Sequence, residues 1–249
     1  MTSKPRVAID LESLAAALPA KNAALAGKIR RCRDSHSVHT DLMHASDMIR
    51  SVGAAFSAVQ SGDEWAQHAI PALVYSGIIL YVRATHSDSK HRVRINLTKH
   101  FSSAQKGVHD RLVTLRNDAL AHYGPGEISE GFAWNEERLL IPMDRPTDAR
   151  IMLASRRVGY APGLPSAIEA HISQVLLYAQ REVERRDAEL TEALNTIIDD
   201  DDGFFDLAAQ HTINLHEMFG GHPAAALLDE DRTGMRTEIV WGSKTDAEN

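Results

Sequence analysis

The chain has 249 residues, 43% of them hydrophobic and 24% charged, with a formal net charge of −7. A single cysteine, Cys32, excludes a disulfide-stapled domain and a cysteine-rich zinc module. The acidic balance argues against a surface that binds nucleic acid everywhere, but it leaves room for a local basic site. No charged segment followed by an apolar one opens the sequence, so we expect no secretory signal and a cytoplasmic location.

The first 35 residues are rich in Ala and Leu, are interrupted by Pro19 and end in a basic cluster. They predict one or two short helices, an N-terminal arm over 1–35. The patterns that follow predict one helical domain over 36–222, and then a polar tail over 223–249.

Two helices are predicted next, each from its apolar pattern. An amphipathic stripe recurs every three or four residues, at Leu42, Ala45, Ile49, Val52, Phe56 and Val59. Ser61-Gly62-Asp63 ends this helix and offers a cap for the next one. Residues 64–82 are apolar around most of a helix circumference but include Gln67, His68, Pro71 and Ser76. A membrane span needs about 20 predominantly apolar residues, so we expect a buried core helix here, with Pro71 at a kink or in its first turn.

A third helix is predicted from about Asn96, because its stripe is the most regular in the chain. The stripe runs through Leu97, Phe101, Ala104, Val108, Leu112, Leu115 and Ala119. Gly124-Pro125-Gly126 ends it, since glycine favours the left-handed cap and proline cannot continue a helix.

The pattern then changes to strands and returns to helix. Residues 132–160 predict a two-stranded β-hairpin with its turn at 144–148. Pro165 and Ser166 open a long helix, and about 34 residues span ~50 Å, so we expect its distal half to pack on a partner chain. The long helix is expected to end at Asp199–Asp202 with Gly203. A last short helix is predicted over 204–219 and a strand over 237–241. The fold class is therefore all-α: a helical bundle with a small β-hairpin insertion and a long helix in its C-terminal half.

The chemistry with the clearest pattern lies at the end of the third helix. Between Leu80 and His122 there are eight Lys or Arg against three Asp, a local reversal of the overall charge. Arg116 and His122 bound the segment Arg116-Asn-Asp-Ala-Leu-Ala-His122. A histidine can take a proton from a ribose 2′-OH and return one to the leaving oxygen. An arginine can clamp the phosphate while negative charge builds on it. The pair therefore indicates cleavage of RNA without a metal.

Helix geometry puts a condition on this interpretation. Six residues on an α-helix correspond to a rotation of about 240°, so Arg116 and His122 do not share one face. Their cooperation requires a distorted final turn, or the groove between two copies of the helix in a homodimer.

Arg116-Asn117 followed by His122, on the third helix after a very apolar second helix, resembles the Arg–polar–x(3–5)–His motif of the HEPN superfamily. With Tyr75-Ser76 in the second helix, the segment 40–125 is most similar to the abortive-infection branch. The resemblance implies a helical bundle that dimerises across the motif helices, and metal-independent endoribonuclease activity in phage defence or toxin–antitoxin systems. It also implies that Arg116 holds the phosphate, that His122 acts as general base or acid, and that Asn117 orients one of them.

The resemblance further implies partners: RNA, a second copy of the chain through the helix ending at His122, and an antitoxin or another defence-system protein. Some antitoxin-paired members carry a modifiable tyrosine two residues after the histidine, whereas Tyr123 directly follows His122 here. Supporting contacts to RNA phosphates are expected from Arg92, Arg94, Lys99 and Arg111.

A non-catalytic interpretation also accounts for Arg116 and His122. His122 is favourable at the negative end of a helix dipole, and Arg116 can pair with Asp118 or with an acid of the long helix. The chain is then an interaction module whose helix forms a dimer or partner interface, and burial of His122 in a closed core would favour this alternative.

Other candidate sites have weaker support. His216-Glu217 is not followed by a second histidine at zinc-motif spacing, and His211, His216 and His222 do not form one. His36, His39 and His44 lack a clear fourth ligand, and Asp199–Asp202 lacks the spacers of a hard-cation loop. The arginines around Cys32 could lower its thiol pKa, but nothing else there indicates a nucleophile. We find no phosphate loop, nucleophile elbow or dinucleotide fingerprint, and expect no metal, cofactor or membrane partner.

Overall fold

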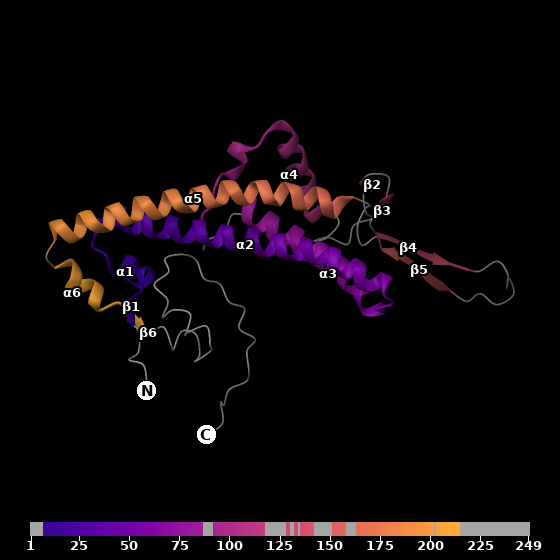
Figure 1. Cartoon of the computed structure of the whole chain (residues 1–249), viewed down its shortest axis with the longest axis horizontal. Helices are drawn as coiled ribbons and strands as arrows, with labels where there is room; N and C mark the ends of the chain where they lie inside the picture. The colour runs from indigo at the N-terminus through magenta and orange to yellow at the C-terminus, as the bar shows by residue number, and fades with distance from the viewer. Residues whose placement is uncertain are drawn as a thin grey trace, which may run out of the picture. The chain divides into compact units, whose positions relative to one another are not determined.

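The computed structural model describes residues 7–86, 92–117, 128–129, 132–133, 135–141, 151–157, 163–201 and 203–214. These residues are mainly helical, with short two-stranded sheets, which confirms the predicted fold class (Figure 1). Contacts divide the chain into two compact units. The terminal unit combines the chain up to His36 with the chain from Arg185 onward, and the central unit is Ser37–Glu184. The chain after Glu184 thus groups with the N-terminal residues, not with the helices of 37–184.

The terminal unit is built from helical segments at both ends of the chain. They are α1 (Leu11–Ala17), the 3-10 helix η1 (Ala20–Asn22), the start of α2 (Ala23–Gln60), the end of α5 (Leu164–Asp200) and α6 (Phe204–Ala209). Their buried residues form one apolar cluster: Leu14, Ala15, Leu25, Ala26, Ile29, Cys32, Leu190, Phe204 and Ala208. The distal part of α5 is therefore covered by residues of its own chain. The N-terminal helices bury the apolar face of this part of α5, and its packing on a partner chain stays a prediction.

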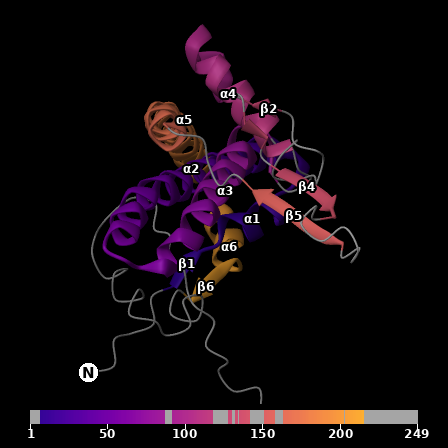
Figure 2. The same cartoon turned by 90° about the vertical axis from the view of Figure 1, so that its right-hand side faces the viewer.

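A small sheet joins the two chain ends of the terminal unit. β1 (Val7–Ile9) pairs antiparallel with β6 (Thr212–Asn214), with Ala8 opposite Ile213, and both views show the two strands side by side (Figures 1 and 2). The prediction of a helix over 204–219 is thus confirmed over Phe204–Ala209 and wrong at Thr212–Asn214, and residues 215–219 lie outside the described residues. Short β-branched segments favour a strand once a partner strand is available, and that partner lies about 200 residues away along the chain.

The central unit packs the remainder of α2 and the start of α5 with α3 (Glu64–Thr85), the 3-10 helix η2 (Leu97–His100) and α4 (Ser103–Leu115). Its core contains the predicted stripe of α2, including Leu42 and Ile49, together with Ile168, Ile172 and Val175 of α5. Gly62 has φ of 89° between α2 and α3, and the Asp63 side chain accepts from the Trp65 N–H, as predicted for this turn and cap. Pro71 lies within α3, beyond its first turn.

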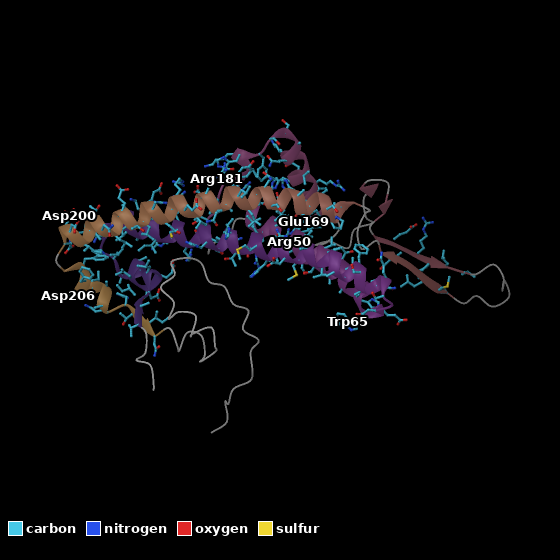
Figure 3. All side chains as sticks on the ribbon, viewed as in Figure 1. Arg50, Trp65, Glu169, Arg181, Asp200 and Asp206 are labelled. Atoms are coloured by element: carbon cyan, nitrogen blue, oxygen red, sulfur yellow. The ribbon has the colours of Figure 1, made fainter. Side chains whose placement is uncertain are left out.

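Close helix packing in the central unit depends on a glycine. A Cβ built on Gly77 of α3 would lie 2.7 Å from Cδ1 of Ile49 on α2 and 3.3 Å from the carbonyl oxygen of Ala45. The same α2 is bridged to α5 at the surface, where Arg50 Nε lies 3.6 Å from Glu169 Oε1 (Figure 3).

α3 is the only described helix long and apolar enough to cross a membrane by length and composition. Its buried residues, including Val74, Ile78, Tyr81 and Val82, belong to the core of the central unit. This is the packing expected of a core helix.

The predicted third helix is divided in two. η2 ends at His100, and α4 begins after Ser102, whose side chain accepts from the Gln105 N–H while the Gln105 side chain accepts from the Ser102 N–H. This reciprocal capping box starts a new helix. Apolar periodicity continued across the break because Leu97, Leu112 and Leu115 are all buried in the same core.

The predicted β-hairpin is confirmed. β4 (Asn135–Leu140) pairs antiparallel with β5 (Met152–Arg157), preceded by a second short pair, β2 (Ile128–Ser129) with β3 (Phe132–Ala133). Large apolar side chains of this hairpin are exposed: Leu139, Leu140, Ile141, Ile151, Met152 and Leu153. The predicted turn at 144–148, the stop at 124–126, the strand at 237–241 and the tail over 223–249 lie outside the described residues.

Candidate functional site

Arg116 and Asn117 lie where α4 ends. The Arg116 N–H donates to the carbonyl oxygens of Leu112 and Val113, and its φ and ψ of −61° and −45° are helical. Residues 116–117 are π-helical. A π-helical turn holds more residues than an α-helical one and occurs frequently at functional sites. The helix thus begins to widen at the first residue of the motif.

The side chains of Arg116 and Asn117 contact each other. Nη1 of Arg116 donates to Oδ1 of Asn117 at 2.9 Å, and both side chains are half-buried. His122 lies outside the described residues. The structure therefore brings together two of the three motif residues and leaves the position of the third as a prediction.

Arg92, one of the four expected phosphate contacts, lies in an internal ion-pair network. Its Nη1 donates to Asp41 Oδ2 at 2.6 Å and to Ser37 Oγ at 3.1 Å, and its Nη2 donates to the Arg83 carbonyl oxygen at 2.6 Å. Arg83 also binds the buried Asp41 carboxylate, through Nε at 2.9 Å and through Nη2. Hydrogen bonding to Asp41 raises the pKa of Arg83 above its ordinary value. The Arg92 side chain is only 16% exposed, so its position is that of a structural residue.

The other three expected phosphate contacts differ in exposure. Lys99 on η2 is exposed, whereas Arg94 and Arg111 are half-buried. Nε of Arg94 is buried and has no hydrogen-bond partner among the described residues. Burial is the largest cause that lowers the pKa of His109, Asp110 opposes it, and Arg94 and Lys106 add smaller lowering effects. Lys99 is therefore the exposed cation among the predicted four.

A buried polar network in the central unit was not predicted. The Tyr81 hydroxyl on α3 lies 2.8 Å from Nδ1 of His109 on α4 and 2.7 Å from Nε2 of His171 on α5. The Phe101 ring contacts both imidazoles edge-on, with centroid distances of 5.6 and 5.5 Å. Burial is the main cause that lowers the pKa of His109, and that lowers the pKa of His171 to about 4. Both histidines are thus neutral at physiological pH, and the network is suited to holding three helices together.

The sequence did contain a signal for this network. His171 lies three residues after Ile168 and four before Val175, within the buried stripe of α5. A histidine in such a stripe needs a buried hydrogen-bond partner. The pattern could not name Tyr81 as that partner, because it comes from another helix.

A second unpredicted cluster lies in the terminal unit. Sγ of Cys32 donates to Oδ1 of Asp187 at 3.1 Å, and Nε2 of His36 lies 2.8 Å from the same oxygen. Burial, and then the hydrogen bond to the Asp187 carboxylate, raise the pKa of the Cys32 thiol to about 12. The suggestion that neighbouring arginines lower this pKa is therefore wrong. Arg186 does act in that direction, but burial and Asp187 outweigh it.

The remaining candidate groups have local partners. Asp201, at the end of α5, accepts from Lys21 Nζ at 2.8 Å and from the Gly203 N–H at 3.2 Å, and these contacts lower its pKa. Nδ1 of His211 lies 2.8 Å from Ser13 Oγ. His216 and His222 lie outside the described residues.

Comparisons of the chain with protein-family models, with curated proteins and with solved structures find no match.

Proposed function

We propose that the chain is a metal-independent endoribonuclease of the HEPN type, in which Arg116, Asn117 and His122 form the active site. The main support is the hydrogen bond from Arg116 Nη1 to Asn117 Oδ1 at the point where α4 starts to widen. Asn117 holds the guanidinium of Arg116 in place at this point of the helix.

In this proposal the reaction is an internal phosphoryl transfer. His122 takes the proton from a ribose 2′-OH, and the new bond from O2′ to phosphorus forms as the bond from phosphorus to the 5′ oxygen breaks. The products are a 2′,3′-cyclic phosphate and a 5′-OH, which receives the proton. Arg116 stabilises the charge that builds on the non-bridging oxygens.

The RNA backbone is proposed to lie near η2 and α4, where the exposed Lys99 contacts a phosphate. The half-buried Arg94 and Arg111 attract the phosphates electrostatically without contacting them. Arg92 is left out of this surface because Asp41, Ser37 and the Arg83 carbonyl oxygen hold its guanidinium. We further propose a cytoplasmic homodimer, with the motif helices at the interface, acting in phage defence or with an antitoxin.

A different function, a non-catalytic interaction module, is favoured by one observation. The β4–β5 hairpin exposes apolar side chains at neighbouring positions of both strands, with Leu139 opposite Leu153 and Leu140 opposite Met152. Adjacent strand positions point to opposite faces, so both faces of the hairpin carry exposed apolar side chains, which is typical of a segment that packs on another surface.

Cleavage of a mixed RNA substrate in EDTA separates the two functions. The comparison includes wild type, His122→Ala, Arg116→Ala and Asn117→Ala. Arg181→Ala is the matched control, because Arg181 is an exposed arginine on α5 of the central unit (Figure 3). We expect activity in wild type and Arg181→Ala. Losing His122 or Arg116 is expected to cost about 10²–10⁴ in rate, and losing Asn117 less. Equal cleavage by all folded variants would contradict the proposal, and so would the absence of cleavage by wild-type protein that is dimeric in solution.

A further inference from the structure

Three different metal-ligating side chains meet in the terminal unit. Cys32 and His36 are four residues apart on α2, so they lie on one face of that helix. Asp187 comes from α5, at the point where the apolar stripe of that helix is interrupted. One donor atom from each, Sγ, Nε2 and a carboxylate oxygen, lies within 4.8 Å of the other two.

We propose that Cys32, His36 and Asp187 bind a transition-metal ion, with Zn²⁺ as the best match to the ligands. This site is separate from the proposed ribonuclease motif and does not depend on it.

The distances fit such an ion after a small adjustment. Zinc is bound at about 2.3 Å by sulfur and at about 2.0–2.2 Å by nitrogen and oxygen, so tetrahedral ligands lie about 3.4–3.6 Å from one another. The sulfur-to-oxygen and nitrogen-to-oxygen distances are now 3.1 and 2.8 Å, as hydrogen bonds require. Each has to open by about half an ångström, and the sulfur-to-nitrogen distance, which is at most 4.8 Å, has to come to about 3.6 Å.

The ligand types select the metal. A thiolate and an imidazole favour zinc, cobalt and related ions, whereas Mg²⁺ and Ca²⁺ require oxygen ligands. The thiolate and the carboxylate together carry two negative charges, which match a divalent ion, and the thiol proton leaves to solvent when the metal binds.

Access to the site is one-sided. Cys32 is buried among the apolar residues of the terminal unit. The His36 and Asp187 side chains are 29% and 46% exposed. An ion can therefore enter from the surface, and a water molecule can complete the coordination.

Packing in the apolar cluster accounts for the burial of Cys32 but not for the contact of its thiol with a carboxylate. A thiol is a weak hydrogen-bond donor, and a serine would hold the Asp187 carboxylate better. For a borderline-soft metal the thiolate is the strongest ligand that a protein offers. The bound ion would join α2 to α5 and stabilise the terminal unit.

The test is titration of the untagged full chain, stripped of metal, with Co²⁺ as a spectroscopic stand-in and then with Zn²⁺. Because Cys32 is the only cysteine of the chain, a thiolate-to-cobalt charge-transfer band assigns the ion to this site without any mutation. We expect one Co²⁺ per chain with this band and tetrahedral visible bands, and their loss when one equivalent of Zn²⁺ displaces the cobalt. Cobalt binding without the band, or no binding, overturns the proposal.

Variants then test the other two ligands. His36→Gln and Asp187→Asn are expected to weaken Zn²⁺ binding at least about 10- to 100-fold, while His44→Gln, another histidine of α2 outside the cluster, leaves it unchanged. Far-ultraviolet circular dichroism confirms that each variant is folded. Equal affinity in all folded variants would contradict the assignment. Ribonuclease activity in EDTA is expected to persist in Cys32→Ser. The metal titrations therefore test the metal site alone, and the assay in EDTA tests the ribonuclease alone.

Discussion

The hydroxyl oxygen of Tyr81 lies 2.7 Å from Nε2 of His171, with Nδ1 of His109 2.8 Å away from the same hydroxyl. A tyrosine hydroxyl has one proton to donate, so one imidazole must accept it while the other donates its own N–H. The network is therefore satisfied when both histidines are neutral and of defined tautomer. It links α3, α4 and α5 within the core of the central unit.

Acid is expected to destabilise the protein through His171. Burial lowers its pKa from 6.5 to about 4 in the folded state. Above pH 6.5 the imidazole is neutral in both states, so its titration does not change the free energy of unfolding there. As the pH falls from 6.5 to 4 the unfolded state binds a proton that the folded state does not, so stability falls by on the order of 3 kcal/mol.

Urea unfolding at pH 7, 5.5 and 4 measures this loss. His171→Leu should be less stable than wild type at pH 7 but should lose less on acidification. An equally steep pH dependence in both proteins would show that carboxylates, not His171, cause the acid sensitivity.

Alanine substitution is predicted to have opposite effects on the free energy of unfolding at Gly77 and at Gly107. At Gly77 a Cβ would meet Ile49 at 2.7 Å, so Gly77→Ala should lower the free energy of unfolding by about 1–3 kcal/mol. At Gly107, inside α4, nothing lies within 4 Å of the added Cβ. Gly107→Ala should therefore raise stability by about 0.5–1 kcal/mol. Thermal denaturation of both variants checks the contrast, and a stabilising Gly77→Ala would mean that α2 and α3 can move apart without cost.

Asp41 is predicted to be a major contributor to the stability of the central unit. Its buried carboxylate accepts from both Arg83 and Arg92. Asp41→Asn keeps the shape but leaves two guanidinium groups without their counter-charge, and should cost about 3 kcal/mol. Because Arg92 is the less exposed of the two arginines, Arg92→Ala should destabilise more than Arg83→Ala. Chemical denaturation ranks the three variants, and the reverse order for the arginines would count against the assignment of Arg92 as structural.

If the proposed function is correct, RNA binding should depend on salt through Lys99. Removing one phosphate contact weakens binding to all sequences and, for a single strand, reduces the slope of log affinity against log salt by about 0.7. Lys99→Gln is therefore expected to give a shallower slope than wild type, and Arg181→Gln an unchanged one. Fluorescence anisotropy with a labelled single-stranded RNA in EDTA measures both, and identical slopes would remove Lys99 from the binding surface.

Much of the helical architecture follows from the sequence, because apolar periodicity is a local property. The stripe of Leu42, Ile49 and Val52 predicted its part of α2, and Gly62 with Asp63 placed the turn before α3. Residues 132–160 likewise predicted the β4–β5 hairpin. Of the candidate site, the sequence supplied Arg116, Asn117 and His122, and the structure adds the hydrogen bond between the first two.

Tertiary structure alone decided which polar side chains meet. Asp41 and Arg92 are 51 residues apart, His36 and Asp187 are 151 apart, and Tyr81 and His171 are 90 apart. Periodicity shows which face of a helix is buried, but not which residue of another helix lies opposite. That pairing depends on the rotation and axial position of each helix, which are set by the packing of the whole core. For this reason an arginine expected to bind phosphate is an internal ion-pair residue, and a cysteine that suggested little on its own lies beside a histidine and a carboxylate.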